Sequence, residues 1–302
     1  MTAKLPSNLV LDDKYTLQQG RAYMSGQQAL VRLPMLQKAN DRRMGLNTSG
    51  FISGYRGSPL AGFDQQLWQA RKHLTEHDIV FQPGLNEDLA ATAVWGSQQL
   101  NLYPNAKFDG VFSMWYGKGP GADRSTDALK HANYAGTSKH GGVLMVVGDD
   151  HAAKSSSIAH QSEHLLAAAG IPVLYPADVQ EILDFGLHGW AMSRFSGLWT
   201  GLKCVTQVIE TSSSVELDPD RVRIILPTDE EFQMPEGGLN IRWPDPPLVQ
   251  EARIMDYKWY AALAYVRANN LNRIVIDSPQ ARFGIITGGK AYQDVRQALN
   301  DL

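Results

Sequence analysis

Residues 51–64 read FISGYRGSPLAGFD, and the fold class follows from this stretch. An apolar run ends at Gly54, a Gly-Ser-Pro turn follows at 57–59, and an amphipathic segment begins after the turn. This order predicts a buried strand, a tight turn and a helix N-terminus, the arrangement that opens a pocket at the carboxyl edge of a parallel sheet. Arg56 and Ser58 offer a cation and a hydroxyl at that edge. The alternative is an ordinary strand–helix corner, in which glycine and proline serve only the turn.

Strand-like and helix-like segments alternate along residues 50–209. The clearest strand is GGVLMVV at 141–147, whose uninterrupted apolar run suits a central parallel strand buried on both faces. Asn86 is a good helix N-cap, and the acidic residues Glu87 and Asp88 favour the first turn of the helix after it. We therefore predict an α/β fold with an open, mostly parallel sheet and helices on both faces.

Proline, glycine and acidic residues concentrate between residues 215 and 250, where we expect a linker. The linker would separate a first domain, residues 1–214, from a C-terminal portion, residues 251–302. That portion is expected to hold two helices and two strands, at 273–277 and 283–287, which is too little for an independent core. We interpret it as the truncated start of a second α/β domain in a chain that continues further.

The composition excludes several classes of protein. With 28 basic and 31 acidic residues the net charge is −3, so neither nucleic acid nor an anionic membrane is an expected partner. No apolar run approaches the length of a membrane span, and the N-terminus lacks the apolar core of a signal peptide. The single cysteine, Cys204, excludes an internal disulfide and any iron–sulfur cluster held by this chain alone. We predict a soluble, cytoplasmic protein.

Three further motifs each have a simpler explanation. HQSEH at 160–164 matches the H-x-x-E-H pattern of zinc peptidases, with Glu163 as general base, but no third ligand can be distinguished. GIITGGKA at 284–291 resembles a phosphate loop that follows a strand, yet Ala291 replaces the hydroxyl residue that binds Mg²⁺. Residues 117–123 are rich in glycine but do not fit the dinucleotide fingerprint, and we expect a loop too rich in glycine to hold one shape without help.

Four stretches together carry a resemblance to a known family. They are GYRGSP at 54–59, NEDLAA at 86–91, GGVLMVVGDDHAAKSSS at 141–157 and IPVLYPAD at 171–178. In this order and spacing they resemble the N-terminal, pyrimidine-binding domain of the 2-oxoacid:ferredoxin oxidoreductases, with the closest likeness to the indolepyruvate ferredoxin oxidoreductases. The likeness extends from about Gly20 to about Glu216. It resumes from Phe283 to Leu299, at the opening of the family's transketolase-C-terminal-like domain.

The resemblance implies an activity and its cofactors. Enzymes of this family oxidatively decarboxylate a 2-oxo acid, here an aryl pyruvate such as indolepyruvate, with thiamine diphosphate and Mg²⁺. Coenzyme A takes the acyl group, and electrons pass through iron–sulfur clusters to ferredoxin. Glu87 matches the glutamate that bonds N1′ of the cofactor's aminopyrimidine, where a carboxyl group can exchange a proton with the ring. Asn86 and Gly57 are assigned to the same cofactor.

The resemblance also suggests how substrate would be held. Ser58 matches the hydroxyl residue that faces the 2-oxo acid in the family. Arg56 stands where many relatives have proline, so a role in binding the substrate carboxylate is our own hypothesis. Asp150 and His151 match a loop near the cofactor, and we assign them proximity to it.

The departures from the family pattern limit what this chain can do. The Gly-Asp-Gly start and downstream Asn of a diphosphate-binding domain are absent from the sequence, as are cluster-binding cysteines. The chain should therefore carry half a cofactor site and be inactive by itself. The remaining domains, or a partner subunit in a homodimer, would complete the site, and exposed apolar surface should mark that interface. The alternative is a non-catalytic α/β module that binds a ligand or a partner.

Overall fold

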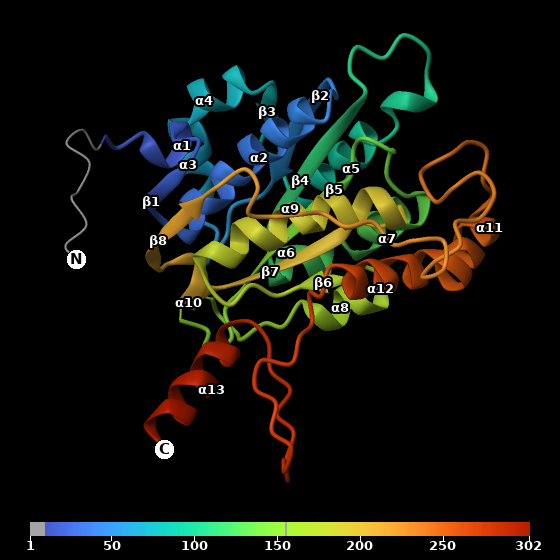
Figure 1. Ribbon diagram of the computed structural model, residues 1–302. Helices are drawn as coiled ribbons and strands as arrows, with labels where there is room; N and C mark the ends of the chain where they lie inside the picture. Colours follow the sequence, from blue (N-terminus) through green and yellow to red (C-terminus); the bar gives the residue numbers. More distant parts are fainter. Residues whose placement is uncertain (1–9, 155) are drawn as a thin grey trace.

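The computed structural model describes residues 10–154 and 156–302, and a parallel β-sheet forms its centre (Figure 1). The sheet has six strands in the order β3-β2-β4-β5-β7-β6, and every neighbouring pair is parallel. The strands are β2 (Thr48–Gly54), β3 (Ile79–Phe81), β4 (Gly110–Lys118), β5 (Val143–Asp149), β6 (Val173–Leu174) and β7 (Thr200–Val205). The predicted parallel α/β class is thus confirmed.

Helices alternate with the strands along the chain. They are α1 (Asp13–Thr16), α2 (Gly26–Arg43), α3 (Phe63–Gln69), α4 (Arg71–Glu76), α5 (Glu87–Ser97), η1 (Leu100–Leu102), α6 (Gly119–Arg124), α7 (Thr126–Ala135), α8 (Glu163–Ala168), α9 (Val179–Ser196), α10 (Thr206–Ile209), α11 (Pro247–Arg253), η2 (Ile254–Lys258), α12 (Trp259–Ala268) and α13 (Lys290–Asp301). Among the described residues, none of these helices combines the length and apolar character that crossing a membrane requires.

Helices cover both faces of the sheet, as the central strands show. Successive side chains of a strand point to opposite faces. In β5, Leu144 and Val146 join the hydrophobic core that includes α2 and α9, whereas Met145 and Val147 join the core that includes α5 and α7. Every residue of β5 is buried, which accounts for the unbroken apolar run at 141–147.

Helix α2 begins later than the sequence predicts, because a strand precedes it. The apolar pattern Ala29, Leu30, Leu33 and Leu36 predicts a helix over 21–43, but the structure has β1 (Gly20–Ser25) followed by α2. Ser25 caps α2 through a reciprocal pair of hydrogen bonds with Gln28. β1 pairs antiparallel with β8 (Ser212–Leu217), a partner far away in the sequence.

The helical segment 247–268 packs on the main body. Tyr265 of α12 is fully buried in the core that contains α9, and its hydroxyl lies 2.9 Å from His188 Nδ1 on α9. Asn269 bonds the backbone of Ile225 in the irregular segment that follows β8. The domain division at residues 214 and 250 stays a prediction.

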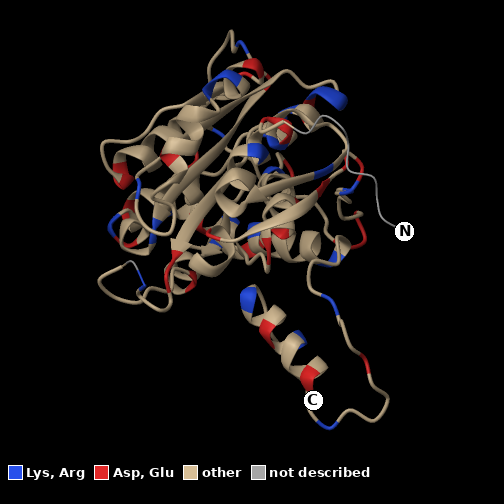
Figure 2. Cartoon of the chain, turned by 90° about the vertical axis from the view of Figure 1, so that its left-hand side faces the viewer, with Lys and Arg blue, Asp and Glu red and all other residues tan. Residues whose placement is uncertain are grey.

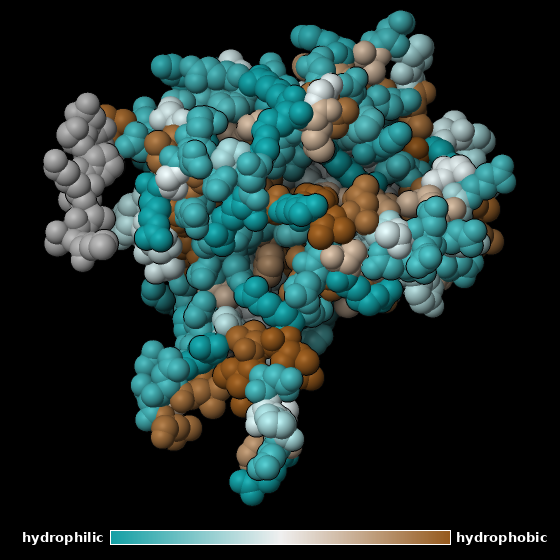
Figure 3. Space-filling view, viewed as in Figure 1, coloured by the Kyte–Doolittle hydropathy of each residue, from teal (hydrophilic) through white to brown (hydrophobic). Residues whose placement is uncertain are grey.

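The two strands predicted at 273–277 and 283–287 do not form. Residues 270–289 are an irregular arm that leaves the body, with hydrophobic side chains gathered near its base and α13 at its end (Figures 2 and 3). Ile274, Phe283 and Ile286 are each more than four-fifths exposed. A strand needs a neighbour to pair its backbone N–H and C=O groups, and these apolar segments lack one in the described structure.

The buried ring of His188 predicts that the fold weakens in mild acid. Burial lowers the pKa of His188 to about 4 from 6.5, although the charge of Asp184 opposes the shift. Below pH 6.5 the unfolded chain takes up a proton that the folded chain resists until about pH 4, so unfolding is favoured in that window. Between pH 7 and 5 the wild-type chain should lose about 2 kcal/mol more unfolding free energy than His188→Gln.

Urea unfolding at several pH values measures this difference. His164, which is exposed, supplies the control: His164→Gln should keep the wild-type pH dependence. If the unfolding free energies of His188→Gln and the wild-type chain change equally with pH, a group other than His188 causes the loss of stability in acid.

Candidate active site

The predicted site residues follow strands that end at one edge of the sheet. Gly54 closes β2 opposite Tyr116 of β4, and Lys118 closes β4 opposite Gly148 of β5. The turn before α5 is drawn to the same edge, because Gly84 N donates to Gly54 O at 2.8 Å. The loops after β2, β3, β4 and β5 therefore converge, as expected for a ligand site in a parallel α/β sheet.

Glu87 is a buried carboxylate at the start of α5, only 7% exposed. Its backbone is fixed, because Trp115 Nε1 donates to Glu87 O at 3.1 Å. Asn86 caps the helix, and its side chain accepts from Leu89 N at 2.9 Å. The amide oxygen of Asn86 is thus engaged in capping, which is a structural role beside the cofactor role that we predict for this residue.

The Glu87 carboxylate fits its space because residue 121 is glycine. A Cβ on Gly121 would lie 2.5 Å from Glu87 Oε1, well inside van der Waals contact. On the other oxygen, Arg124 Nε lies 3.9 Å from Glu87 Oε2, while the same guanidinium donates to Asp88 at 3.0 Å. The carboxylate is therefore held between a glycine backbone and one guanidinium.

The prediction that residues 117–123 form a loop is wrong. β4 continues to Lys118, and the short helix α6 begins at Gly119. Pro120 stands in the first turn of α6, where its fixed φ and missing N–H suit a helix. That proline is the signal in the sequence that favours a helix here.

The Gly-Ser-Pro turn at 57–59 packs against the end of β4. The Lys118 stem crosses Gly57, where a Cβ would lie 2.7 Å from Lys118 Cδ. Arg56 is exposed and Ser58 is half-buried, and both belong to the loop that follows the carboxyl end of β2. Arg56 also faces Asp64: burial raises the pKa of that carboxyl, while Tyr116 and the Arg56 charge oppose the shift.

The loop after β5 is anchored by Asp149. Its carboxylate accepts from Ser162 N at 2.9 Å and from Ser162 Oγ at 2.6 Å, and Lys203 Nζ lies 3.6 Å away. Asp150, the predicted neighbour of the cofactor, is buried. His151 is exposed and lies near Glu163, not against Glu87.

The zinc-peptidase motif does not assemble. His160 precedes α8, so it does not share a helix face with His164, and its Nε2 lies 2.9 Å from Asp123 Oδ2. Burial raises the pKa of Glu163, but its hydrogen bond to Lys203 brings the pKa below its usual value. Within residues 10–154 and 156–302, no group of three or more His, Cys, Asp or Glu side chains could hold a metal ion.

The resemblance of residues 284–291 to a phosphate loop also fails. The strand that we expect before them does not form, and the only regular element is α13, which begins at Lys290. Gly289 packs on the ring of Tyr175, and Lys290 pairs with Asp294. These contacts make the glycines part of a helix start, the simpler of the two explanations.

Several residues at the site were not assigned to it from the sequence. Trp115 and Arg124 were not singled out at all, whereas Lys118, Gly119, Gly121, Asp123 and His160 were noted only as parts of other motifs. Most belong to β4 and α6, and they meet Glu87 or the turn only through the sheet order β2-β4-β5. Sequence spacing gives no measure of such contacts.

Comparisons of the sequence with known proteins give consistent results. The family model described as the indolepyruvate ferredoxin oxidoreductase middle domain matches residues 272–302. Indolepyruvate oxidoreductase subunit IorA of Methanothermobacter thermautotrophicus is 26% identical over 258 residues, 84% of this chain and 38% of that protein. The subunit of the same name from Pyrococcus abyssi is 27% identical over 202 residues, 65% of this chain and 30% of that protein.

A solved structure shares the fold. It is the 2-oxoglutarate:ferredoxin oxidoreductase from Magnetococcus marinus, with 2-oxoglutarate, coenzyme A and succinyl-CoA bound. The TM-score is 0.63 at 16% identity, over 94% of this chain and 52% of that chain. The chain is thus similar to proteins of the 2-oxoacid:ferredoxin oxidoreductase family. In sequence it is similar to the IorA subunits of indolepyruvate oxidoreductase, and it spans 38% of the length of the Methanothermobacter relatives.

Proposed function

We propose that this chain is the pyrimidine-binding portion of a thiamine-diphosphate-dependent 2-oxoacid:ferredoxin oxidoreductase. The proposed substrate is an aryl pyruvate such as indolepyruvate, with coenzyme A as acyl acceptor and ferredoxin as electron acceptor. The observation that carries the proposal is the buried carboxylate of Glu87 at the carboxyl edge of a parallel sheet. Similarity to indolepyruvate oxidoreductase subunits supports the choice of substrate class.

The residues present fit one half of the cofactor. A buried carboxyl group with few protein partners can donate a hydrogen bond to the ring nitrogen of an aminopyrimidine, which needs one proton donor. The sequence lacks the Gly-Asp-Gly start and downstream Asn that hold the diphosphate and its Mg²⁺ in a diphosphate-binding domain. We therefore assign the pyrimidine end to this chain, and the diphosphate and metal to another domain or subunit.

The chain's own residues would act as follows. When bound, thiamine diphosphate supplies the carbon nucleophile that attacks the 2-oxo group. Glu87 would hold and exchange a proton at N1′ of the pyrimidine, and Gly57 would let the turn approach the cofactor. The Ser58 hydroxyl and the Arg56 guanidinium would bind and orient the oxo acid at the same edge. Asp150 and His151 would line the loop beside it.

Apolar side chains stand exposed around Glu87. Leu85 is 86% exposed and Leu89 is 51% exposed, two residues before and two residues after Glu87, and Tyr55, the first residue after β2, is 39% exposed. Exposed apolar groups beside a buried charge suggest a surface that another protein part covers. In the proposed enzyme this cover is the diphosphate-binding part, in a cytoplasmic assembly that also supplies the iron–sulfur clusters and forms a homodimer. This chain alone would then be inactive.

The test is calorimetric titration with thiamine diphosphate and Mg²⁺. We expect tight binding by the assembled enzyme, with the diphosphate-binding part present, and weak binding or none by the 302-residue chain. The same assembly should reduce ferredoxin when given an aryl pyruvate and coenzyme A. Tight binding by the chain alone would contradict the half-site, and binding by neither would favour the non-catalytic module.

A further inference from the structure

The short helix α6 is enclosed between two polar side chains that come from different elements. On one side Gly121 lies against the Glu87 carboxylate, as described above. On the other side the imidazole of His160 lies against Gly119, where a Cβ would overlap the ring. Both contacts require glycine, so α6 is fitted closely between Glu87 and His160.

His160 is tied to the far end of the same helix. Its Nε2 lies 2.9 Å from Asp123 Oδ2, and its side chain is 13% exposed. A carboxylate only accepts hydrogen bonds, so Nε2 carries the proton and donates it. Nδ1 is buried and has no hydrogen-bond partner among the described residues.

The segment that carries His160 is itself fixed to the sheet. Two residues further on, Ser162 gives both its N–H and its Oγ–H to Asp149, the last residue of β5. Asp149 is fully buried. A continuous set of contacts therefore connects the end of β5 to His160, then to α6, and finally to the Glu87 carboxylate.

We infer that His160 and Asp123 form a positioning pair that holds α6 against Glu87 and so sets the orientation of its carboxylate. The inference rests on the proposed function, in which that carboxylate meets the pyrimidine. A six-residue helix has little stability of its own, so its position depends on such tertiary contacts. His160 acts through α6 and touches neither substrate nor cofactor.

The first test needs no cofactor. In amide hydrogen–deuterium exchange of the 302-residue chain, His160→Ala should raise deuterium uptake in a peptide covering residues 119–124 by about tenfold in rate, because a charge-assisted hydrogen bond is lost. Asp123→Ala should do the same. His160→Gln can still donate to Asp123 and should restore protection. His164→Ala, an exposed histidine four residues away, is the matched control and should leave uptake unchanged.

The second test measures the consequence for Glu87 in the assembled enzyme. The rate at which the C2 proton of bound thiamine diphosphate exchanges with deuterium should fall by about tenfold in His160→Ala, with cofactor affinity unchanged, and recover in His160→Gln. If His160 only stabilised the fold, His160→Ala would lower the unfolding free energy or the affinity for thiamine diphosphate, and the C2 exchange rate of the bound cofactor would not change.

The outcomes separate the two proposals. Unchanged uptake at 119–124 in His160→Ala overturns the positioning pair, and so does raised uptake with wild-type C2 exchange. Glu87→Gln is the reference variant. If it leaves C2 exchange at the wild-type rate, the proposed function itself is wrong. If it abolishes the exchange while His160→Ala does not slow it, only the positioning inference fails.

Discussion

Replacing Glu87 with glutamine is expected to lower the rate of 2-oxo acid decarboxylation by about a thousandfold in the assembled enzyme. Glutamine has nearly the same size as glutamate, so it fits the space that Gly121 leaves, and α5 should keep its start. It can form a hydrogen bond to a ring nitrogen, but it cannot exchange a proton with it. The loss should therefore appear in kcat, with little change in the affinity for thiamine diphosphate.

Ferredoxin reduction at saturating oxo acid measures this effect. Glu251, on the surface of α11, supplies the matched control, and Glu251→Gln should keep the wild-type rate. Activity of Glu87→Gln within tenfold of wild type would remove Glu87 from the proton transfer. An assembled wild-type protein without any activity would instead favour the non-catalytic module.

The parts of the fold that local sequence determines could be predicted. The sequence predicts a long helix over 179–196, and α9 spans these residues because Asp178 caps its start and Gly197 ends it in a left-handed conformation. The same holds for α5, where Asn86 makes the predicted cap. Strand β5 could be recognised because a central parallel strand is apolar on both faces.

Contacts between distant segments could not be predicted. β1 forms because β8 pairs with it from the other end of the domain, and nothing near Gly20 indicates that partner. The cap at Ser25 was a usable signal for the start of α2, but it does not say that the preceding residues are extended. For the site, the role of Glu87 was predicted by resemblance, while the contacts of Gly121 with Glu87 and of His160 with Gly119 could be seen only in the structure.

The arm, residues 270–289, shows the opposite error: the β-propensity of its residues predicts strands that do not form. Residues 273–277 and 283–287 are rich in β-branched and aromatic side chains, which favour strands. Within the described part of the chain, these segments lie exposed with no paired neighbour, and α13, whose hydrogen bonds are internal, is the regular element that forms after them. A high β-propensity does not by itself produce a strand, because the backbone of a strand forms its hydrogen bonds with a neighbouring strand.

Replacing Arg194 with methionine is expected to reduce the unfolding free energy by about 3–5 kcal/mol. Arg194 donates to both carboxylate oxygens of Asp41, at 2.6 and 2.8 Å, and Asp41 is fully buried. This pair joins α9 to α2 across one face of the sheet, and Arg194 Nε also bonds Gly141 O at 2.8 Å just before β5. Methionine keeps most of the apolar stem but leaves a buried, uncompensated carboxylate.

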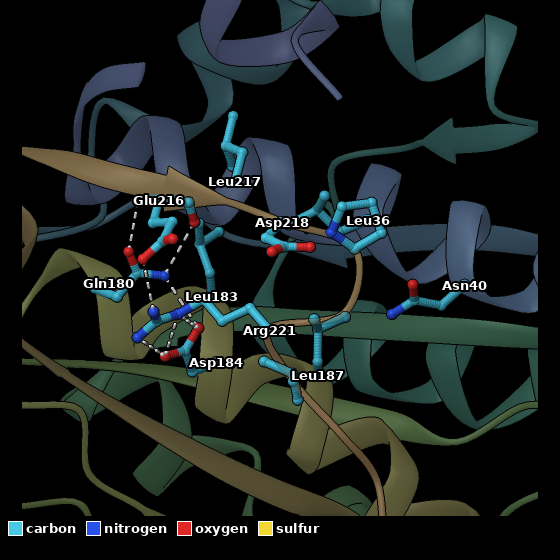
Figure 4. Close-up of a pocket in the computed structure, with 12 residues that line it drawn as sticks. Leu36, Asn40, Gln180, Leu183, Asp184, Leu187, Glu216, Leu217, Asp218 and Arg221 are labelled. Atoms are coloured by element: carbon cyan, nitrogen blue, oxygen red, sulfur yellow. Dashed lines mark hydrogen bonds and ion pairs between the residues drawn. The ribbon is translucent and has the colours of Figure 1, made fainter. Parts of the chain in front are cut away.

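Urea denaturation of the chain and two further variants test this explanation. Arg221→Met removes an arginine that pairs with Asp184 and Glu216 nearer the solvent (Figure 4), and it should cost less than about 1 kcal/mol. The double variant Asp41→Leu with Arg194→Met removes both charges, so it should be more stable than Arg194→Met alone. If it is instead less stable than Arg194→Met, the loss comes from the other partners of Asp41, Thr48 and Gln37, and the ion pair is not the dominant contact between α2 and α9.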